Sequence, residues 1–356
     1  MIKQNGPSAT PVNLRLRAWG WLARKQASVA GKSDAEIIAL QSRSMPDNKV
    51  MNWIFGAVPA TVQTTDRRIP GPGGEIPVRV YRRADAASTV TAASTTAAST
   101  TAASTAGTVG TAEAGRRPLI VYFHGGGFVL GDLDLGNWIC GTVADRVGAV
   151  VVSVEYRLAP SHPFPAAVDD CYAALTWAAD NAAELGAAGP AGVMGESAGA
   201  TLAAVCCLLA RDRGGPAIRH QALIYPAADL TDSDEPSAAA PNAPFLSSAE
   251  LDAYKRLYLG PAGDVTDPRV SPLLAADHAG LPPALIQVAE HDPLREDGQR
   301  YAAVLRAAGV PVRLTEYVGV PHGFVNFPGL SRAAHQAMAE VCAEQSDALS
   351  SEGANR

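Results

Sequence analysis

Short apolar runs alternate with helical stretches through most of this chain, and this alternation limits its fold more than any other feature. Helical patterns cover residues 166–185, 198–211 and 297–308, among others. The apolar runs cover residues 119–123, 149–154, 191–194, 221–225, 284–289 and 312–317. Continuously apolar strands that alternate with helices are typical of parallel sheets covered on both faces. The sequence therefore predicts an α/β fold with a mostly parallel central sheet and helices on both faces.

The chain upstream of these runs contains three different patterns. Residues 13–56 are helical in character, and Ser33 and Glu36 have the spacing of a capping box at a helix start. Residues 61–66 and 76–81 flank a proline- and glycine-rich turn, which predicts a β-hairpin. From residue 84 to about 115 the chain repeats Ala-Ala-Ser-Thr with almost no large apolar residue. Such a tract cannot offset its ordering entropy by burial, so we expect a flexible surface loop there.

The alternation lapses between residues 229 and 273, where polar, proline-containing sequence surrounds one helix at 248–259. This segment has the position of a lid, and no strand pattern supports a separate domain in it. We therefore expect a cap built from an N-terminal helical segment, residues 1–56, and an insertion, residues 229–273. The core is then expected in two parts, residues 57–228 and 274–356.

Composition narrows the range of partners. The chain has 356 residues and a formal net charge of -6, which provides no basic footprint for nucleic acid. No apolar run approaches the length of a membrane span, and the N-terminus shows no leader pattern, so we expect a cytoplasmic protein. The five cysteines lack metal-site spacing, and the adjacent pair Cys206 and Cys207 lies in an apolar helical stretch typical of buried thiols.

The sharpest motif is Gly195-Glu196-Ser197-Ala198-Gly199, which follows one expected strand and opens one expected helix. A serine in such a turn has strained backbone angles, and a Cβ at either flanking glycine would clash. The turn lifts the hydroxyl clear of the sheet, and the helix N-terminus favours developing negative charge. The pattern favours a nucleophilic Ser197 over an ordinary tight turn.

A second motif, His124-Gly125-Gly126-Gly127-Phe128, directly follows the expected strand 119–123. Successive glycines leave backbone N–H groups unobstructed, as the oxyanion of a tetrahedral intermediate requires. A phosphate-binding loop is disfavoured because the lysine that would follow is missing. We expect His124 to be a structural hydrogen-bonding residue of this loop and not a base.

A serine hydroxyl needs a base, and the base needs an orienting partner. In this class of fold the chain order is serine, acid, histidine. His322 lies just after the last expected strand, and Asp292 lies directly after the strand 284–289. Asp297 is the rival acid, but it is expected to belong to the following helix, where aspartate is common anyway.

Taken together, these motifs resemble those of the hormone-sensitive-lipase-like family of bacterial carboxylesterases, which have the α/β-hydrolase fold. The resemblance extends from about residue 76 to the end of the chain, except for the Ala-Ser-Thr insert. It rests on residues 124–127, 156–160, 162–166 and Asp169, on the serine turn, and on residues 292–294 and 322–324. Glu196 departs from the family pattern, which more often has aspartate there, and we expect this change to leave the chemistry untouched.

The resemblance implies a Ser197, His322 and Asp292 triad and an oxyanion hole formed by the N–H groups of Gly126, Gly127 and Ala198. It also implies a cap over an acyl pocket and no metal or organic cofactor. The implied partner is a small-molecule ester with a short-to-medium acyl chain, and a homodimer along the last strand is compatible with the family. We expect Phe128, Trp53 and Phe324 to line the substrate pocket.

Two other functions remain open at this stage. Plant gibberellin receptors resemble the same family and bind a hormone, but their catalytic histidine is replaced, whereas His322 is present here. Related triads also cleave amides, lactones or carbamates, and nothing in the motifs excludes those substrates. Ester hydrolysis is the easiest chemistry for this set of residues.

Overall fold

The computed structural model describes residues 10–43, 46, 48–84, 117–231 and 243–350. Within these residues, eight strands form one sheet in the order β1-β2-β4-β3-β5-β6-β7-β8. The Ala-Ser-Thr insert expected to be a flexible loop lies outside the described residues. The strands are β1 (Val62–Gly71), β2 (Gly74–Arg83), β3 (Leu119–Phe123), β4 (Val150–Val154), β5 (Ala191–Glu196), β6 (Ile218–Ile224), β7 (Ala284–His291) and β8 (Val312–Pro321).

The sheet combines an antiparallel edge with a parallel body. β1 and β2 form the predicted hairpin, and β2 runs antiparallel to β4. From β4 through β8 every neighbouring pair is parallel. β3 and β4 are buried along their whole length, which explains their continuously apolar sequences. The predicted mostly parallel α/β fold is confirmed.

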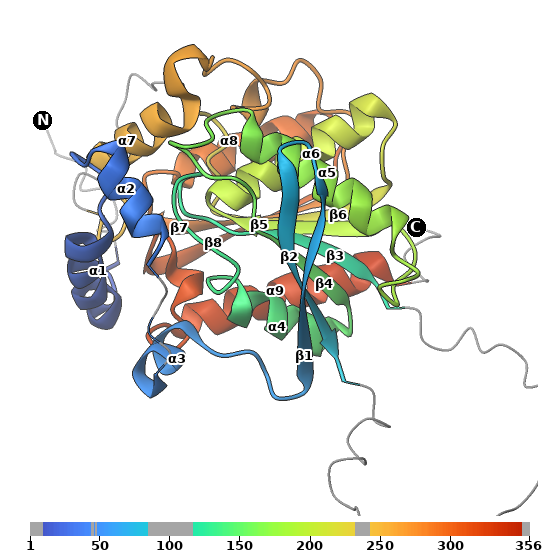
Figure 1. The fold of residues 1–356 in the computed structure, drawn as a ribbon, viewed down its shortest axis with the longest axis horizontal. Helices are drawn as coiled ribbons and strands as arrows, with labels where there is room; N and C mark the ends of the chain where they lie inside the picture. The colour runs from blue at the N-terminus through green and yellow to red at the C-terminus, as the bar shows by residue number, and fades with distance from the viewer. Residues whose placement is uncertain (1–9, 44–45, 47, 85–116, 232–242, 351–356) are drawn as a thin grey trace, which may run out of the picture.

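Helices cover both faces of this sheet (Figure 1). One face packs against α5, α6 and α8, and the other packs against α4 and α9, so that two large apolar clusters lie on opposite sides of the strands. The N-terminal helices α1 to α3 and the helix α7 lie beyond one end of the sheet (Figure 1). The helices are α1 (Leu14–Ala27), α2 (Asp34–Gln41), α3 (Lys49–Phe55), α4 (Asn137–Val147), α5 (Ala166–Asp180), α6 (Ala198–Arg213), α7 (Ser248–Leu259), α8 (Arg295–Ala307) and α9 (Arg332–Leu349).

Local sequence signals account for several of these boundaries. Ser33 accepts a hydrogen bond from the backbone N–H of Glu36, and the Glu36 side chain accepts one from Ser33, so the predicted capping box begins α2. All five cysteines lie in the described part of the chain, and each is a buried free thiol, as expected for Cys206 and Cys207. Among the described residues no helix is long and apolar enough to cross a membrane.

The parts of the described chain that precede and follow the Ala-Ser-Thr insert are joined by a hydrogen bond. Arg117 Nη1 donates a hydrogen bond of 2.6 Å to the carbonyl oxygen of Arg83, at the end of β2. We therefore expect the chain without residues 86–112 to fold and to keep nearly all of the activity that its motifs predict, because the hydrogen bond between Arg117 and Arg83 is retained. Hydrolysis rates of the purified deletion variant test this, and loss of folded, active protein would show that the insert packs on the core.

An ion pair fixes the segment after β4 to helix α5. Arg157 donates from Nε and Nη2 to the two carboxylate oxygens of Asp170, both at 2.8 Å, and the Asp170 side chain is 1% exposed. Arg157→Met removes the charged partner of that buried carboxylate and leaves it the backbone N–H of residue 157. We therefore expect the free energy of unfolding to fall by about 3 kcal/mol. Arg67→Met is the matched control, because Arg67 pairs with a Glu184 that is 62% exposed. Its cost should stay below about 1 kcal/mol in the same denaturant titration. Equal losses would contradict this assignment.

Candidate active site

The turn from β5 to α6 places Ser197 at its apex. Ser197 has φ 55° and ψ −125°, a conformation that side chains rarely adopt, and its N–H donates to the Ile224 carbonyl at 2.9 Å. A Cβ at Gly199 would stand 2.0 Å from the Phe123 carbonyl oxygen, and one at Gly195 would stand 2.3 Å from the Gly199 carbonyl oxygen. Both glycines are therefore required by close backbone approach, as the sequence predicted.

Ser197, His322 and Asp292 form a continuous hydrogen-bonded row. Ser197 Oγ lies 2.8 Å from His322 Nε2, and His322 Nδ1 lies 2.7 Å from Asp292 Oδ2. Asp292 is fully buried, and its other oxygen accepts a hydrogen bond of 2.8 Å from the N–H of Leu294. Because a carboxylate can only accept, Asp292 orients the ring with Nδ1 protonated, which leaves Nε2 as an acceptor for the serine proton.

The glycine loop lies beside this row. Gly126, Gly127 and Ala198 line the same cavity as Ser197 and His322. Ala198 is the first residue of α6, so its N–H has no partner within the helix and is available to a ligand. The three groups predicted to form the oxyanion hole thus lie together around the serine.

His124 is held inside the fold by its own loop. Its ring is buried, stacks on Tyr156 with the ring centroids 4.3 Å apart, and places Nδ1 2.8 Å from the Gly125 carbonyl oxygen. The Tyr156 hydroxyl donates to the His124 carbonyl at 2.7 Å. Burial lowers the pKa of His124, which keeps the ring neutral. These contacts agree with the structural function expected for His124.

Glu196 has a closer connection to the site than the sequence indicated. Its side chain is 2% exposed, lines the cavity, and accepts a hydrogen bond of 2.6 Å from the N–H of Gly125. Burial raises the pKa of Glu196, and the Gly125 N–H partly offsets that rise. Glu196 therefore anchors the glycine loop to the serine turn. The only sequence signal for Glu196 was its position inside the serine motif. That position does not reveal the contact with residue 125.

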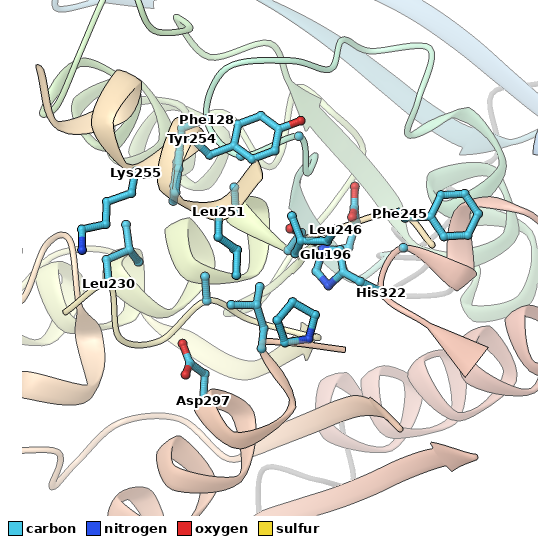
Figure 2. Close-up of a pocket in the computed structure, with 18 of the residues that line it drawn as sticks. Phe128, Glu196, Leu230, Phe245, Leu246, Leu251, Tyr254, Lys255, Asp297 and His322 are labelled. Atoms are coloured by element: carbon cyan, nitrogen blue, oxygen red, sulfur yellow. The ribbon is translucent and has the colours of Figure 1, made fainter. Parts of the chain in front are cut away.

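The row opens into a cavity of about 460 Å³, which lies between the strand ends and α7. Figure 2 shows His322 and Glu196 toward one end of the cavity, and Leu230 and Lys255 toward the opposite end. Its wall is largely apolar, and the larger apolar residues are Phe128, Leu135, Leu230, Phe245, Leu246, Leu251, Pro293, Leu294 and Phe327. A space of this size and lining suits a small organic ligand.

Only one of the three predicted pocket aromatics lines this cavity. Phe128 does so, and its ring stacks on Tyr258 with the centroids 3.7 Å apart. Trp53 is 54% exposed on α3, outside the cavity lining, because the buried face of that short helix is formed by Ile54. Phe324 is fully buried between Tyr225 and Tyr317, so it belongs to the core. The predictions for Trp53 and Phe324 are corrected accordingly.

Asp297, the rival acid, has another set of partners. It lies in the first turn of α8, as expected, and accepts hydrogen bonds from Asp229 N–H at 3.1 Å and from Arg300 at 3.0 Å. Burial raises the pKa of Asp297 to about 7, although the Asp229 N–H and Arg300 act in the opposite direction. The side chain lines the cavity wall but joins α8 to the segment after β6, whereas Asp292 holds His322.

Two segments far apart in the sequence meet above the glycine loop. Glu250 on α7 accepts hydrogen bonds from the N–H groups of Val29 at 3.1 Å and Ala30 at 3.3 Å, and from the Ser28 hydroxyl. A Cβ at Gly127 would stand 2.3 Å from the Tyr254 ring, so α7 rests directly on that loop. The N-terminal segment and α7 are therefore joined to each other, and α7 packs on the glycine loop.

Comparison with known proteins now identifies the family. The family model described as the alpha/beta hydrolase fold matches residues 120–326, which include the serine, the acid, the histidine and the glycine loop. The chain belongs to the α/β-hydrolase family. Its branch is the hormone-sensitive-lipase-like one, as the motifs predicted.

Similar α/β-hydrolases are found among both characterised sequences and solved structures. The chain is 44% identical to the esterase LipI of Mycobacterium tuberculosis, over 78% of this chain and 79% of that protein. It is 42% identical to the carboxylic ester hydrolase LipN of the same organism, over 74% of this chain and 65% of LipN. A hyperthermophilic esterase from Pyrobaculum calidifontis superposes with a TM-score of 0.78 at 34% identity, covering 95% of this chain and 99% of that one.

Glu196 provides a test of how this α/β-hydrolase holds its glycine loop. Glu196→Gln keeps an oxygen that can accept from Gly125 N–H, so we expect kcat to stay within about threefold of wild type. Glu196→Ala leaves that buried N–H unpaired and the loop unanchored, and kcat should fall by about tenfold or more, equivalent to about 1.4 kcal/mol. Steady-state kinetics on one short ester, with unfolding midpoints as a check on folding, separates the outcomes. Equal damage by both variants would assign the effect to the charge.

Proposed function

We propose that this protein is a serine carboxylesterase, in which Ser197 is the nucleophile, His322 the general base and acid, and Asp292 the orienting carboxylate. The observation that carries the proposal is the row Ser197 Oγ, His322 Nε2, His322 Nδ1 and Asp292 Oδ2, with steps of 2.8 and 2.7 Å, at the end of an apolar cavity. The names of the related esterases support the same class of reaction.

Acylation begins when His322 Nε2 accepts the proton of Ser197 Oγ as the oxygen bonds to the ester carbonyl carbon. The carbonyl oxygen becomes an oxyanion, which accepts hydrogen bonds from the N–H groups of Gly126, Gly127 and Ala198. Asp292 stabilises the imidazolium that forms. The C–O bond to the alcohol then breaks, the alcohol oxygen takes the proton from His322, and an acyl-enzyme remains on Ser197.

Deacylation repeats these steps with water. His322 Nε2 removes a proton from water as the water oxygen bonds to the acyl carbon. The oxyanion that forms accepts hydrogen bonds from the same three N–H groups. The bond to Ser197 Oγ then breaks, and His322 returns the proton to the serine. The chain's own residues supply every proton transfer in this cycle.

The substrate we infer is an ester with a short-to-medium acyl chain. The side chains of Leu230, Leu246 and Leu251 offer apolar contact, and α7 forms one wall of the cavity of about 460 Å³. A long chain would have to displace this cap. We infer that residues 1–56 and 229–273 act together as the cap, and that residues 57–228 and 274–356 form the core that carries the triad.

Hydrolysis of p-nitrophenyl esters from acetate to palmitate tests the proposal. We expect the highest kcat/KM on acyl chains of about two to eight carbons, because a cavity of this size holds a small organic ligand. Ser197→Ala should lower kcat by about a millionfold, and Asp292→Asn by about ten-thousandfold, since the asparagine favours the wrong ring tautomer.

Asp297→Asn is the matched control, because its carboxylate lies in the same cavity wall but does not contact His322. This variant should retain most of the wild-type kcat. Highest activity on chains of twelve or more carbons would contradict the proposed pocket. A folded wild-type protein without activity on any of these esters would contradict esterase function, and amide and lactone substrates would then be tested next.

A further inference from the structure

Helix α1 is apolar on two opposite faces. Its inward face packs Leu16, which is fully buried, and Trp19 into the protein. Its outward face carries Leu14, Ala18, Trp21 and Leu22, which follow the helical spacing i, i+4, i+7 and i+8. All four are exposed, and Leu14, Trp21 and Leu22 are 75%, 58% and 41% exposed. We call these four residues the α1 outer face.

The α1 outer face remains exposed to solvent in the folded chain. A helix that only covers a core shows one apolar stripe and one polar face. Here the second stripe contains a tryptophan and two leucines, the side chains that gain most from leaving water. A clustered, exposed apolar face of this kind marks a surface that binds something.

Charge indicates what this surface binds. The sequence of α1 contains four basic residues, Arg15, Arg17, Arg24 and Lys25, and no acidic residue, although the whole chain has a net charge of -6. Arg15 and Arg17 are exposed beside the apolar stripe. Basic residues that border a stripe of Trp and Leu are typical of helices that lie in the headgroup layer of an anionic membrane. A protein partner with an acidic rim would match the same charge, and the experiments below distinguish it from lipid.

We propose that the α1 outer face is a docking surface for anionic lipid, on which the protein binds reversibly at the surface of a bilayer or of a lipid aggregate. Leu14, Trp21 and Leu22 enter the headgroup and acyl boundary, and Arg15 and Arg17 contact phosphate groups. Val50 and Trp53 of α3, in the same N-terminal segment, are also exposed, at 61% and 54%. This inference concerns the location of the protein and goes beyond the proposed hydrolysis.

The inward face of α1 connects this surface to the candidate active site. Trp19 packs edge-on against Phe327, with the ring centroids 6.4 Å apart, and Phe327 lines the cavity. A Cβ at Gly20 would stand 2.7 Å from the Pro244 side chain, directly before the cavity residue Phe245. Docking by α1 would therefore place the lipid surface about one helix diameter, roughly 10 Å, from the cavity wall.

Vesicle binding tests the proposal. The probes are vesicles of phosphatidylcholine alone and of phosphatidylcholine with about 30% phosphatidylglycerol. Binding is measured by flotation and by the blue shift of tryptophan fluorescence, with the Ser197→Ala background used so that lipid is not consumed. We expect binding to the anionic vesicles that weakens as salt rises, and at least about tenfold weaker binding to the neutral ones.

Variants assign the binding to the helix. Leu14→Ser with Trp21→Ser and Leu22→Ser should weaken anionic vesicle binding at least about tenfold, and Arg15→Glu with Arg17→Glu should weaken it similarly. Leu274→Ser is the matched control, because Leu274 is 41% exposed, like Leu22, but lies outside the cap. On p-nitrophenyl acetate, the same substitutions with Ser197 intact should hydrolyse at the wild-type rate, which shows that the fold is kept.

Three results would overturn the proposal. One is no binding of the parent protein to anionic vesicles. Another is equal loss of binding in the Leu274→Ser control. The third is a concentration-dependent dimer, seen by sedimentation, that the triple variant abolishes while vesicle binding is unaffected, since the α1 outer face would then be a protein interface. Failure of the proposed esterase activity would appear only in the ester assay and leaves the vesicle result unchanged.

Discussion

The close approach of the β5–α6 turn to the end of β3 determines the arrangement of the site. Gly199 passes so near the Phe123 carbonyl that a Cβ there would stand 2.0 Å from the oxygen. This contact places Ser197 beside the loop that begins at His124, although α4, β4, α5 and β5 lie between the two segments in the sequence. A larger residue at 199 would push the turn away from β3 and separate the nucleophile from the glycine loop. The geometry proposed for oxyanion stabilisation thus begins as a backbone packing constraint.

Two buried carboxylates fix the groups on either side of the serine by the same physical means. Asp292 accepts from the N–H of Leu294, and Glu196 accepts from the N–H of Gly125. Each backbone donor is held by the fold, so each carboxylate is oriented without a long flexible partner. The second oxygen of Asp292 is then left for His322. Burying two acidic groups close to Ser197 is costly, and these hydrogen bonds offset part of that cost.

The sequence predicted most of the sheet, and it singled out the three residues that the structure joins in one hydrogen-bonded row, because both depend on local patterns. Doubly buried strands are continuously apolar, and the serine, acid and histidine each follow a strand. Trp53 and Phe324 were assigned to the pocket wrongly, since an aromatic side chain faces a cavity, the core or solvent according to tertiary packing alone. The contact of Glu196 with Gly125 joins residues 71 positions apart, which no local pattern encodes.

The helices of the proposed cap contact the glycine loop and the chain next to it directly. Gln41 Nε2 donates to the carbonyl oxygens of Val129 and Ala159, at 2.7 and 2.8 Å, so α2 is bonded to the chain that continues from the loop. Glu250 binds the same N-terminal segment to α7, and Tyr254 of α7 lies on Gly127. Displacement of these helices would therefore break contacts with the glycine loop and with the chain that continues from it. Because α1 belongs to this N-terminal segment, a surface that binds α1 acts on an element already connected, through hydrogen bonds, to the groups around Ser197.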